Sequence, residues 1–277
     1  MMSNASNATL RQKFAREICA QAGVRDARIE QAFAETPREE FAGPPPWFVA
    51  SFGSYVETRD VVDLYRDCLV AIDPARGVNI GEPALHARCM QELAPREGET
   101  VLHIGAGVGY YTAMLARLVG ATGKVVGYEI DPGIAARART NLRDCANVRI
   151  EARSGIAPDL PEADVIYVNA GAIEPYACWR AALRPGGRLL FPLEAPGAVG
   201  AMLLVQKGAS AARWPARFLF PVAFIACEAA RDAAAERRLA ERFADESWRK
   251  VRSLRFDARD EACWLAGDGW WLSTDPP

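Results

Sequence analysis

The chain has 277 residues, of which 50% are hydrophobic and 25% are charged, and its formal net charge is −2. These values are typical of a globular protein, and the small net charge gives no support for a nucleic-acid partner. No apolar run reaches the length of a transmembrane helix, and residues 1–8 lack the apolar core of a signal peptide. Seven dispersed cysteines without a C-x-x-C pair indicate reduced thiols, and only two histidines give little support for a zinc site. We therefore expect a cytoplasmic protein without a metal, membrane or nucleic-acid partner.

The first part of the chain is rich in helical patterns. Residues 1–8 are expected to be disordered. Amphipathic periodicity predicts helices at 10–22, 27–34 and 84–93. Asp26 can cap the second of these helices because its side chain accepts backbone N–H bonds.

An irregular segment separates the second and third of these helices. Residues 41–47 contain three consecutive prolines and predict an extended loop, 60–72 are weakly patterned, and 77–83 predict a loop. Aromatic side chains follow the prolines, and a packed lid explains them better than stacking on a substrate does. These aromatic residues are Trp47, Phe48, Phe52 and Tyr55.

The centre of the chain reads as a strand, a glycine-rich turn and a helix. The apolar run 101–104 predicts a buried strand, and Gly105, Gly107 and Gly109 follow it at alternate positions. Glycine adopts positive φ and lets a ligand approach the backbone, and the helix 111–119 begins with unpaired N–H groups. An ordinary tight turn is the alternative interpretation of three glycines alone.

The next strand favours a nucleoside ligand. It ends at Glu129, twenty positions after Gly109, where a carboxylate can accept both hydroxyls of a ribose. The spacing G-x-G-x-G is not the dinucleotide fingerprint, because Tyr110 occupies the position of its final small residue. The pattern resembles class I S-adenosylmethionine (AdoMet) methyltransferases, and we expect binding of AdoMet and not of NAD.

Strands and helices alternate through this central region, which predicts a doubly wound, mainly parallel α/β sheet covered on both faces. Strands are expected at 99–104, 124–129, 147–152, 164–169, 186–193 and 200–206, with helices at 111–119, 132–143 and 174–183.

The pattern changes beyond residue 207. We expect a strand at 217–227, an exposed helix at 231–243 and short strands at 251–256, 262–266 and 270–273. Tryptophans 264, 270 and 271 are expected to pack the last hairpin onto the main domain. The predicted division is a helical and lid region at 1–98, an AdoMet-binding core at 99–227 and a packed extension at 228–277.

Several segments resemble the protein-L-isoaspartate O-methyltransferases, and the resemblance extends over about residues 28–227. The resemblance implies a Rossmann-like, seven-stranded sheet with an antiparallel final hairpin, preceded here by N-terminal helices and followed by a helix and hairpin. It also implies AdoMet as cofactor and S-adenosyl-L-homocysteine as product. The segments that carry it are 37–41, 80–87, 101–112, 123–129, 147–155, 164–170 and 183–192.

The resemblance assigns roles to residues around the cofactor. Glu129 matches the acid that binds the ribose, Ser154 lies where the family has an aspartate beside the adenine amino group, and Ile130 and Ile156 would flank the adenine ring. The full set of cofactor-binding candidates is His103, Gly105, Ala106, Gly107, Gly109, Tyr110, Glu129, Ile130, Ser154, Gly155, Ile156 and Asn169.

Three departures from the family concern function. Gly81 replaces a serine linked to catalysis, Asn79 replaces a threonine, and His103 replaces the acid that helps to hold the methionine ammonium. Glu82 adds negative charge where a carboxylate would approach, unless it points away or pairs with an arginine such as Arg76. His86 matches a family position on the helix over the cofactor, although a semi-buried histidine without chemical function is the simpler interpretation. No catalytic residue is assigned, and the candidate acceptor loop contains Asn79, Gly81, Glu82 and His86.

The leading hypothesis is an AdoMet-dependent O-methyltransferase that acts on a carboxylate, as the resemblance implies. A methyltransferase for another peptide or for a small molecule is the first alternative. A catalytically weak AdoMet-binding protein is the second, since the serine and the strand-end acid are both absent.

Overall fold

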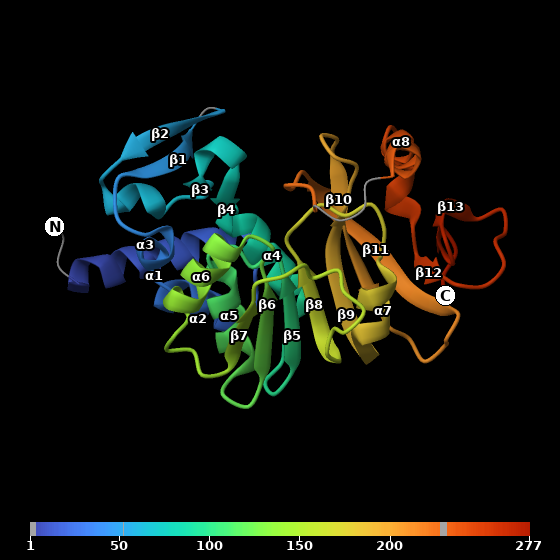
Figure 1. Ribbon diagram of the computed structural model, residues 1–277, viewed down its shortest axis with the longest axis horizontal. Helices are drawn as coiled ribbons and strands as arrows, with labels where there is room; N and C mark the ends of the chain where they lie inside the picture. The colour runs from blue at the N-terminus through green and yellow to red at the C-terminus, as the bar shows by residue number, and fades with distance from the viewer. Residues whose placement is uncertain (1–3, 52, 228–231) are drawn as a thin grey trace. The chain divides into compact units, whose positions relative to one another are not determined.

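The computed structural model describes residues 4–51, 53–227 and 232–277, and the chain forms two compact units (Figure 1). The first unit contains the chain up to residue 99 together with 106–153, and the second contains 100–105 together with the chain from 154 onward. Among the described residues, no helix combines the length and the apolar character needed to cross a membrane. The three-part division expected from the sequence stays a prediction.

Four helices form the N-terminal part of the first unit: α1 (Asn4–Ala22), α2 (Ala27–Glu35), α3 (Arg38–Ala42) and α4 (Pro83–Leu93). The Asp26 side chain accepts the Arg28 N–H, which confirms the predicted cap. The expected disorder was wrong for residues 4–8, which lie in α1, whereas residues 1–3 lie outside the described residues. Extending an existing helix fixes one residue per hydrogen bond gained, so small residues such as Ala5 and Ala8 can join it cheaply.

A four-stranded antiparallel sheet lies within 47–80, where the sequence predicted loops at 41–47 and 77–83 and showed only a weak pattern at 60–72. Its order is β2 (Ser54–Thr58), β1 (Trp47–Ser51), β3 (Val70–Asp73) and β4 (Val78–Ile80). Short 3₁₀ turns lie at Val61–Leu64 and Pro74–Arg76. In Figure 1 the strands β1 and β2 lie above α1 and α3.

The two loop predictions hold for residues 43–46, 77 and 81–82, and they are wrong for 41–42 in α3, 47 in β1, 78–80 in β4 and 83 in α4. Trp47 and Val49 of β1 are buried while Phe48 between them is only partly buried, which is the alternation of a half-buried strand. Tyr55 lies in β2 and is partly exposed, and Phe52 lies outside the described residues. Trp47, which the sequence placed in a loop, thus begins strand β1 together with Phe48.

The first unit also contains α5 (Tyr110–Val119), β6 (Lys124–Tyr128), α6 (Pro132–Asn141) and β7 (Val148–Glu151), with β6 and β7 parallel. Asp131 caps α6 by accepting the Ile134 N–H at 2.8 Å, and Pro132 occupies the first turn as expected.

The second unit is built on parallel strands β5 (Thr100–Ile104), β8 (Ala163–Val168) and β9 (Leu183–Leu193). Strands β10 (Gly200–Gln206) and β11 (Arg213–Val222) continue it antiparallel, and α7 (Ala177–Ala182) precedes β9. Strands β5–β11 provide the predicted seven strands of the α/β core. The expected helix 174–183 is shorter, because Leu183 already pairs with Ala163 in the sheet.

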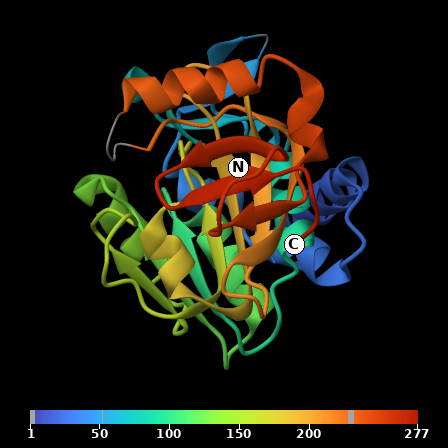
Figure 2. The same cartoon turned by 90° about the vertical axis from the view of Figure 1, so that its right-hand side faces the viewer.

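The extension adds α8 (Ala233–Arg242), a 3₁₀ turn (Glu246–Lys250), β12 (Ser253–Arg255), β13 (Cys263–Gly267) and β14 (Trp270–Ser273). Its strands continue the sheet in the order β11, β12, β14, β13. Figure 2 shows these three red strands below the orange helix α8. Phe218 of β11 makes edge-on ring contacts with Phe243, Trp248 and Trp264 of the extension, so Trp264 packs the hairpin onto the core as expected.

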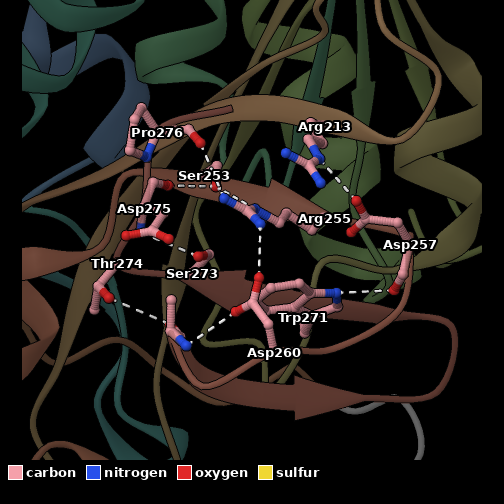
Figure 3. Close-up of polar contacts among 11 residues, drawn as sticks. Arg213, Ser253, Arg255, Asp257, Asp260, Trp271, Ser273, Thr274, Asp275 and Pro276 are labelled. Carbon is pink, nitrogen blue, oxygen red and sulfur yellow. Dashed lines mark hydrogen bonds and ion pairs between the residues drawn. The ribbon is translucent and has the colours of Figure 1, made fainter.

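A buried arginine fixes the end of the extension (Figure 3). Arg255 is 3% exposed and pairs with Asp260 at 3.2 Å. It donates to the Ser253 hydroxyl at 3.1 Å and to the Pro276 carbonyl at 3.0 Å, and its guanidinium lies 4.9 Å from the Trp271 ring centre. One cation therefore holds the final residues against β12 and β14.

We expect Arg255→Met to lower the free energy of unfolding by about 2–4 kcal/mol, because several hydrogen bonds from a buried charge are lost together. Arg213→Met is the control, since Arg213 is partly exposed and pairs with Asp257 at 2.7 Å near the surface of the protein. That variant should lose less than about 1 kcal/mol. Urea unfolding of both variants measures the difference, and equal losses would contradict it.

Candidate functional site

The glycine turn has the backbone conformation that the spacing predicted. Gly105, Gly107 and Gly109 have φ values of +74°, +57° and +92°. A Cβ on Gly109 would lie 2.6 Å from Leu142 Cδ1, so packing against α6 demands a glycine there. At Gly107, in contrast, no described residue other than its two chain neighbours has an atom within 4 Å of the position that a Cβ would take. Gly107 therefore leaves open space over its backbone, as a ligand-binding turn requires.

Glu129 is linked directly to this turn. Its Oε2 accepts the Gly107 N–H at 2.8 Å, and its Oε1 accepts the Asp131 N–H at 3.0 Å. Burial raises the pKa of Glu129, while these backbone N–H groups oppose the rise. The carboxylate thus positions the turn through the same oxygens that were predicted to bind a ribose. The adjacent Ile130 is 47% exposed, so an apolar surface is accessible beside it.

The side chain of Tyr110 lies in the core of the first unit. It is 1% exposed, and its ring packs edge-on against Phe41 at 5.5 Å. Of the predicted cofactor residues, Tyr110 can therefore offer a ligand only its backbone.

Arg38 is a buried hydrogen-bond donor to several backbone carbonyls, and the sequence did not predict this role. It is fully buried, and its guanidinium donates to the carbonyl groups of Leu64, Arg66, Cys68 and Gly81 at 2.7–3.3 Å. Arg38 lies inside the family-like segment 37–41, but a single arginine in a sequence does not reveal that it is buried. Arg38 holds the acceptor-loop candidate Gly81 against the chain segment 64–68.

Gly81 and His86 are complementary in shape. A Cβ on Gly81 would lie 2.2 Å from His86 Nε2, so the imidazole occupies the space of a side chain at position 81. His86 is 3% exposed and stacks on Tyr111 with ring centres 3.7 Å apart. The Tyr111 hydroxyl donates to the Gly81 carbonyl at 2.7 Å. His86 is therefore locked over Gly81.

The other two acceptor-loop candidates are Asn79 and Glu82, and they lie in different surroundings. The Asn79 side chain donates to the Gly77 carbonyl at 2.9 Å. Glu82 is exposed, and partial burial of its carboxyl together with the charge of Asp67 raises its pKa. The suggested pair with Arg76 is wrong, because Arg76 binds Asp73 and Asp131, each at 2.6 Å.

In the second unit, the buried His103 and the partly buried Asn169 form a pair at the ends of β5 and β8. His103 is fully buried, and burial lowers its pKa to about 3, which leaves the ring neutral. Its Nε2 lies 2.7 Å from Asn169 Nδ2, and the Asn169 N–H donates to the Ile104 carbonyl at 2.8 Å. Asn169 Oδ1 is buried without a hydrogen-bond donor in the described part of the chain. His103 therefore orients Asn169 instead of presenting its own ring at the surface.

The segment predicted to lie beside the adenine has a fixed turn. The Ser154 hydroxyl accepts the Ile156 N–H at 3.1 Å, which is the local turn bond typical of serine. A Cβ on Gly155 would lie 2.6 Å from Ile104 Cγ2, and the Gly155 carbonyl accepts the Trp179 indole N–H at 2.8 Å. Close packing against β5 thus requires Gly155.

Glu194 is a second residue that the sequence reasoning missed. It directly follows β9 and is 3% exposed; its Oε1 accepts the Phe224 N–H at 2.8 Å. Its Oε2 is buried and has no donor within the described ranges. Burial raises the pKa of Glu194 to about 7. An acid at the end of an apolar strand was the signal used for Glu129, and the same signal was present here.

Glu194 should make stability depend on pH. Its pKa is higher in the folded state than in the unfolded chain, where it has the ordinary value of 4.5. The folded state therefore loses stability as pH rises from about 4.5 through 7, by a few kcal/mol at about 1.4 kcal/mol per pKa unit. We expect Glu194→Gln to reduce the difference in unfolding free energy between pH 5 and pH 8, measured with urea. Glu261→Gln, an exposed carboxylate in the same unit, should leave that difference unchanged.

Known proteins match most of the chain. The sequence profile of the family described as protein-L-isoaspartate(D-aspartate) O-methyltransferase matches residues 10–228. Protein-L-isoaspartate O-methyltransferase 2 of Anaeromyxobacter sp. strain Fw109-5 is 32% identical over 78% of this chain and 82% of its own. The relative from Anaeromyxobacter dehalogenans strain 2CP-C is 34% identical over 73% and 90%.

Solved structures agree with this assignment. One protein-L-isoaspartate O-methyltransferase structure has a TM-score of 0.64 at 25% identity and covers 84% of this chain and 69% of its own. Another, from Plasmodium falciparum in complex with S-adenosyl-L-homocysteine, has a TM-score of 0.63 at 18% identity, covering 78% and 97%, and supports the fold alone. The chain therefore belongs to the protein-L-isoaspartate(D-aspartate) O-methyltransferase family of AdoMet-dependent methyltransferases.

Proposed function

We propose that this protein transfers the methyl group of AdoMet to the carboxylate of isoaspartyl residues in peptides and proteins. The observation that carries the proposal is the open glycine turn at Gly107, held by the buried Glu129 carboxylate. The named activity of the relatives supports the acceptor class. We place this activity in the cytoplasm, and the composition supports a protein that works without a nucleic-acid or membrane partner.

The residues present fit the cofactor. The backbone of Gly105–Gly109 would pass the methionine part, since a ligand can approach the turn at Gly107 without meeting a side chain. Glu129 would accept the ribose hydroxyls, with Ile130 as an apolar wall. On the second unit, Asn169 Oδ1 would take an N–H donor, and the turn Ser154–Ile156 would contribute to the adenine site. The buried, unpaired Oδ1 supports the role of Asn169.

For methyl transfer to a carboxylate, the main task of the protein is to position the acceptor oxygen in line with the methyl group. When bound, AdoMet supplies a sulfonium methyl group, which an acceptor oxygen takes while the carbon–sulfur electron pair stays on sulfur. A carboxylate is already deprotonated at neutral pH and needs no general base, so holding it in line and excluding water provide most of the rate. The absence of a hydroxyl at Gly81 is therefore compatible with turnover.

The acceptor loop nonetheless differs from that of the family. His86 occupies the space where a serine at position 81 would place its side chain. Glu82 has no pair with Arg76 that would neutralise it. Both features favour poor activity on ordinary isoaspartyl peptides, and they favour a different carboxylate acceptor as the second candidate function.

Glu129→Ala should weaken S-adenosyl-L-homocysteine binding by about 1.5–3 kcal/mol, because hydrogen bonds to a charged partner are lost and the turn loses its anchor at Gly107. Calorimetry measures the dissociation constant. Glu151→Ala is the control, since Glu151 ends the neighbouring strand β7 and forms an ion pair with the exposed Arg149 at 2.9 Å. An unchanged constant in Glu129→Ala would show that the ribose is held elsewhere.

The space that His86 occupies beside Gly81 can be opened for a serine side chain. Gly81→Ser alone should lower activity, because its Cβ conflicts with the His86 ring. Gly81→Ser combined with His86→Ala removes the conflict and should raise kcat/KM on an isoaspartyl peptide about tenfold or more, in the range of a positioned hydrogen bond. His86→Ala alone is the control, since it opens the space without supplying a hydroxyl.

Radiolabelled methyl transfer to the peptide measures all three variants. A double variant no better than His86→Ala, with S-adenosyl-L-homocysteine still bound, would point to a different acceptor. The predicted poor activity would be refuted if the wild type matched a dedicated repair enzyme.

A further inference from the structure

Two buried hydrogen-bond acceptors lie at the carboxyl ends of adjacent parallel strands. Asn169 directly follows β8, and Glu194 directly follows β9. Asn169 Oδ1 and Glu194 Oε2 are both buried and lack a donor among the residues described. In open α/β sheets, ligands bind at the carboxyl ends of parallel strands. Buried acceptors without partners are costly, so this edge of the sheet calls for a ligand that carries N–H groups.

The fold around Glu194 is built to hold a carboxyl group. A Cβ on Gly171 would lie 2.2 Å from Glu194 Oε1, and a Cβ on Gly200 would lie 2.3 Å from Glu194 Cβ. Both glycines therefore make room for this side chain. The Phe224 N–H fixes Oε1, which determines where the second oxygen points. The chain next to Gly171 is also fixed, because its N–H donates to the Ile225 carbonyl at 2.9 Å.

The strand order places Asn169 beside the glycine turn and Glu194 one strand farther from it, so the two residues would face different parts of the bound molecules. Asn169 is adjacent to the glycine turn, since a Cβ on Gly105 would lie 3.1 Å from the Asn169 carbonyl oxygen. Strand β9 pairs with the far side of β8, so Glu194 lies one strand farther from Gly105. A donor that reaches Glu194 therefore belongs to the molecule beyond the cofactor, which is the methyl acceptor.

We propose that Glu194 is a specificity residue for the acceptor, and that its Oε2 receives a peptide N–H next to the methylated carboxylate. This inference rests on the proposed function. A peptide carries such N–H donors beside its isoaspartyl residue, whereas a simple carboxylic acid does not. Glu194 thereby favours peptide acceptors over small carboxylates. Its raised pKa is in keeping with a carboxyl group whose second oxygen is unpaired before the acceptor binds.

Glu194→Gln tests the proposal. Because the Phe224 N–H requires an oxygen, the amide must place its NH2 group where Oε2 was, and this donor then faces the donor of the peptide. We expect KM for a blocked isoaspartyl peptide to rise tenfold or more, with unchanged affinity for S-adenosyl-L-homocysteine. Asp164→Asn is the matched control, an acid at the opposite end of β8 that pairs with Arg184. It should leave KM unchanged.

A second peptide identifies the contact itself. N-methylation of the amide beside the isoaspartyl residue removes the proposed donor, so it should raise KM in the wild type and add little in Glu194→Gln. An unchanged KM in Glu194→Gln, or an equal penalty from N-methylation in both proteins, would overturn the inference and leave the proposed function standing. Loss of S-adenosyl-L-homocysteine affinity in the variant would assign Glu194 to the fold and overturn it as well. A wild type that methylates neither peptide would refute the proposed function together with this inference.

Discussion

The buried guanidinium of Arg38 is the interaction on which the acceptor side of the first unit depends. A fully buried cation is costly unless its donors find acceptors, and here backbone carbonyls of Leu64, Arg66, Cys68 and Gly81 accept hydrogen bonds from its two terminal nitrogens. These carbonyls come from two separate chain segments, so one side chain fixes both at once. The Tyr111 hydroxyl adds a second bond to Gly81. The backbone at position 81 is thus held in place although the residue has no side chain of its own.

The sequence predicted the structure best where a feature depends on neighbouring residues in the chain alone. The alternation of apolar runs predicted the α/β core, because buried parallel strands and their helices each carry their own period. Gly105, Gly107 and Gly109 predicted the turn, because positive φ is a property of the single residue. The small sheet β1–β4 could not be predicted in this way, since its strands β2–β4 are mostly partly exposed and carry no continuous buried run like that of β5.

The site residues that were missed share one property, which is that their meaning depends on distant neighbours. Arg38 can link several backbone carbonyls only because the fold brings residues 64–68 and Gly81 around its guanidinium. Glu194 becomes an unpaired acid only when Gly171 and Gly200 leave room for it. The same limit applies to His86, whose ring occupies the space of a side chain at Gly81, a contact that the sequence alone does not reveal.

The extension changes which strand forms the boundary of the sheet in the second unit. Without residues 253–273, the ten-residue strand β11 would present its unpaired backbone groups at one side. With them, β12 pairs with Arg213–Pro215, and rings of Phe243, Trp248 and Trp264 cover Phe218 farther along β11. The outermost strand becomes β13, which has five residues and a register irregularity. Long, regular edges template intermolecular pairing, and short, irregular ones do so poorly. The extension, which lies beyond the family match, thereby disfavours pairing of this sheet edge with another copy of the chain.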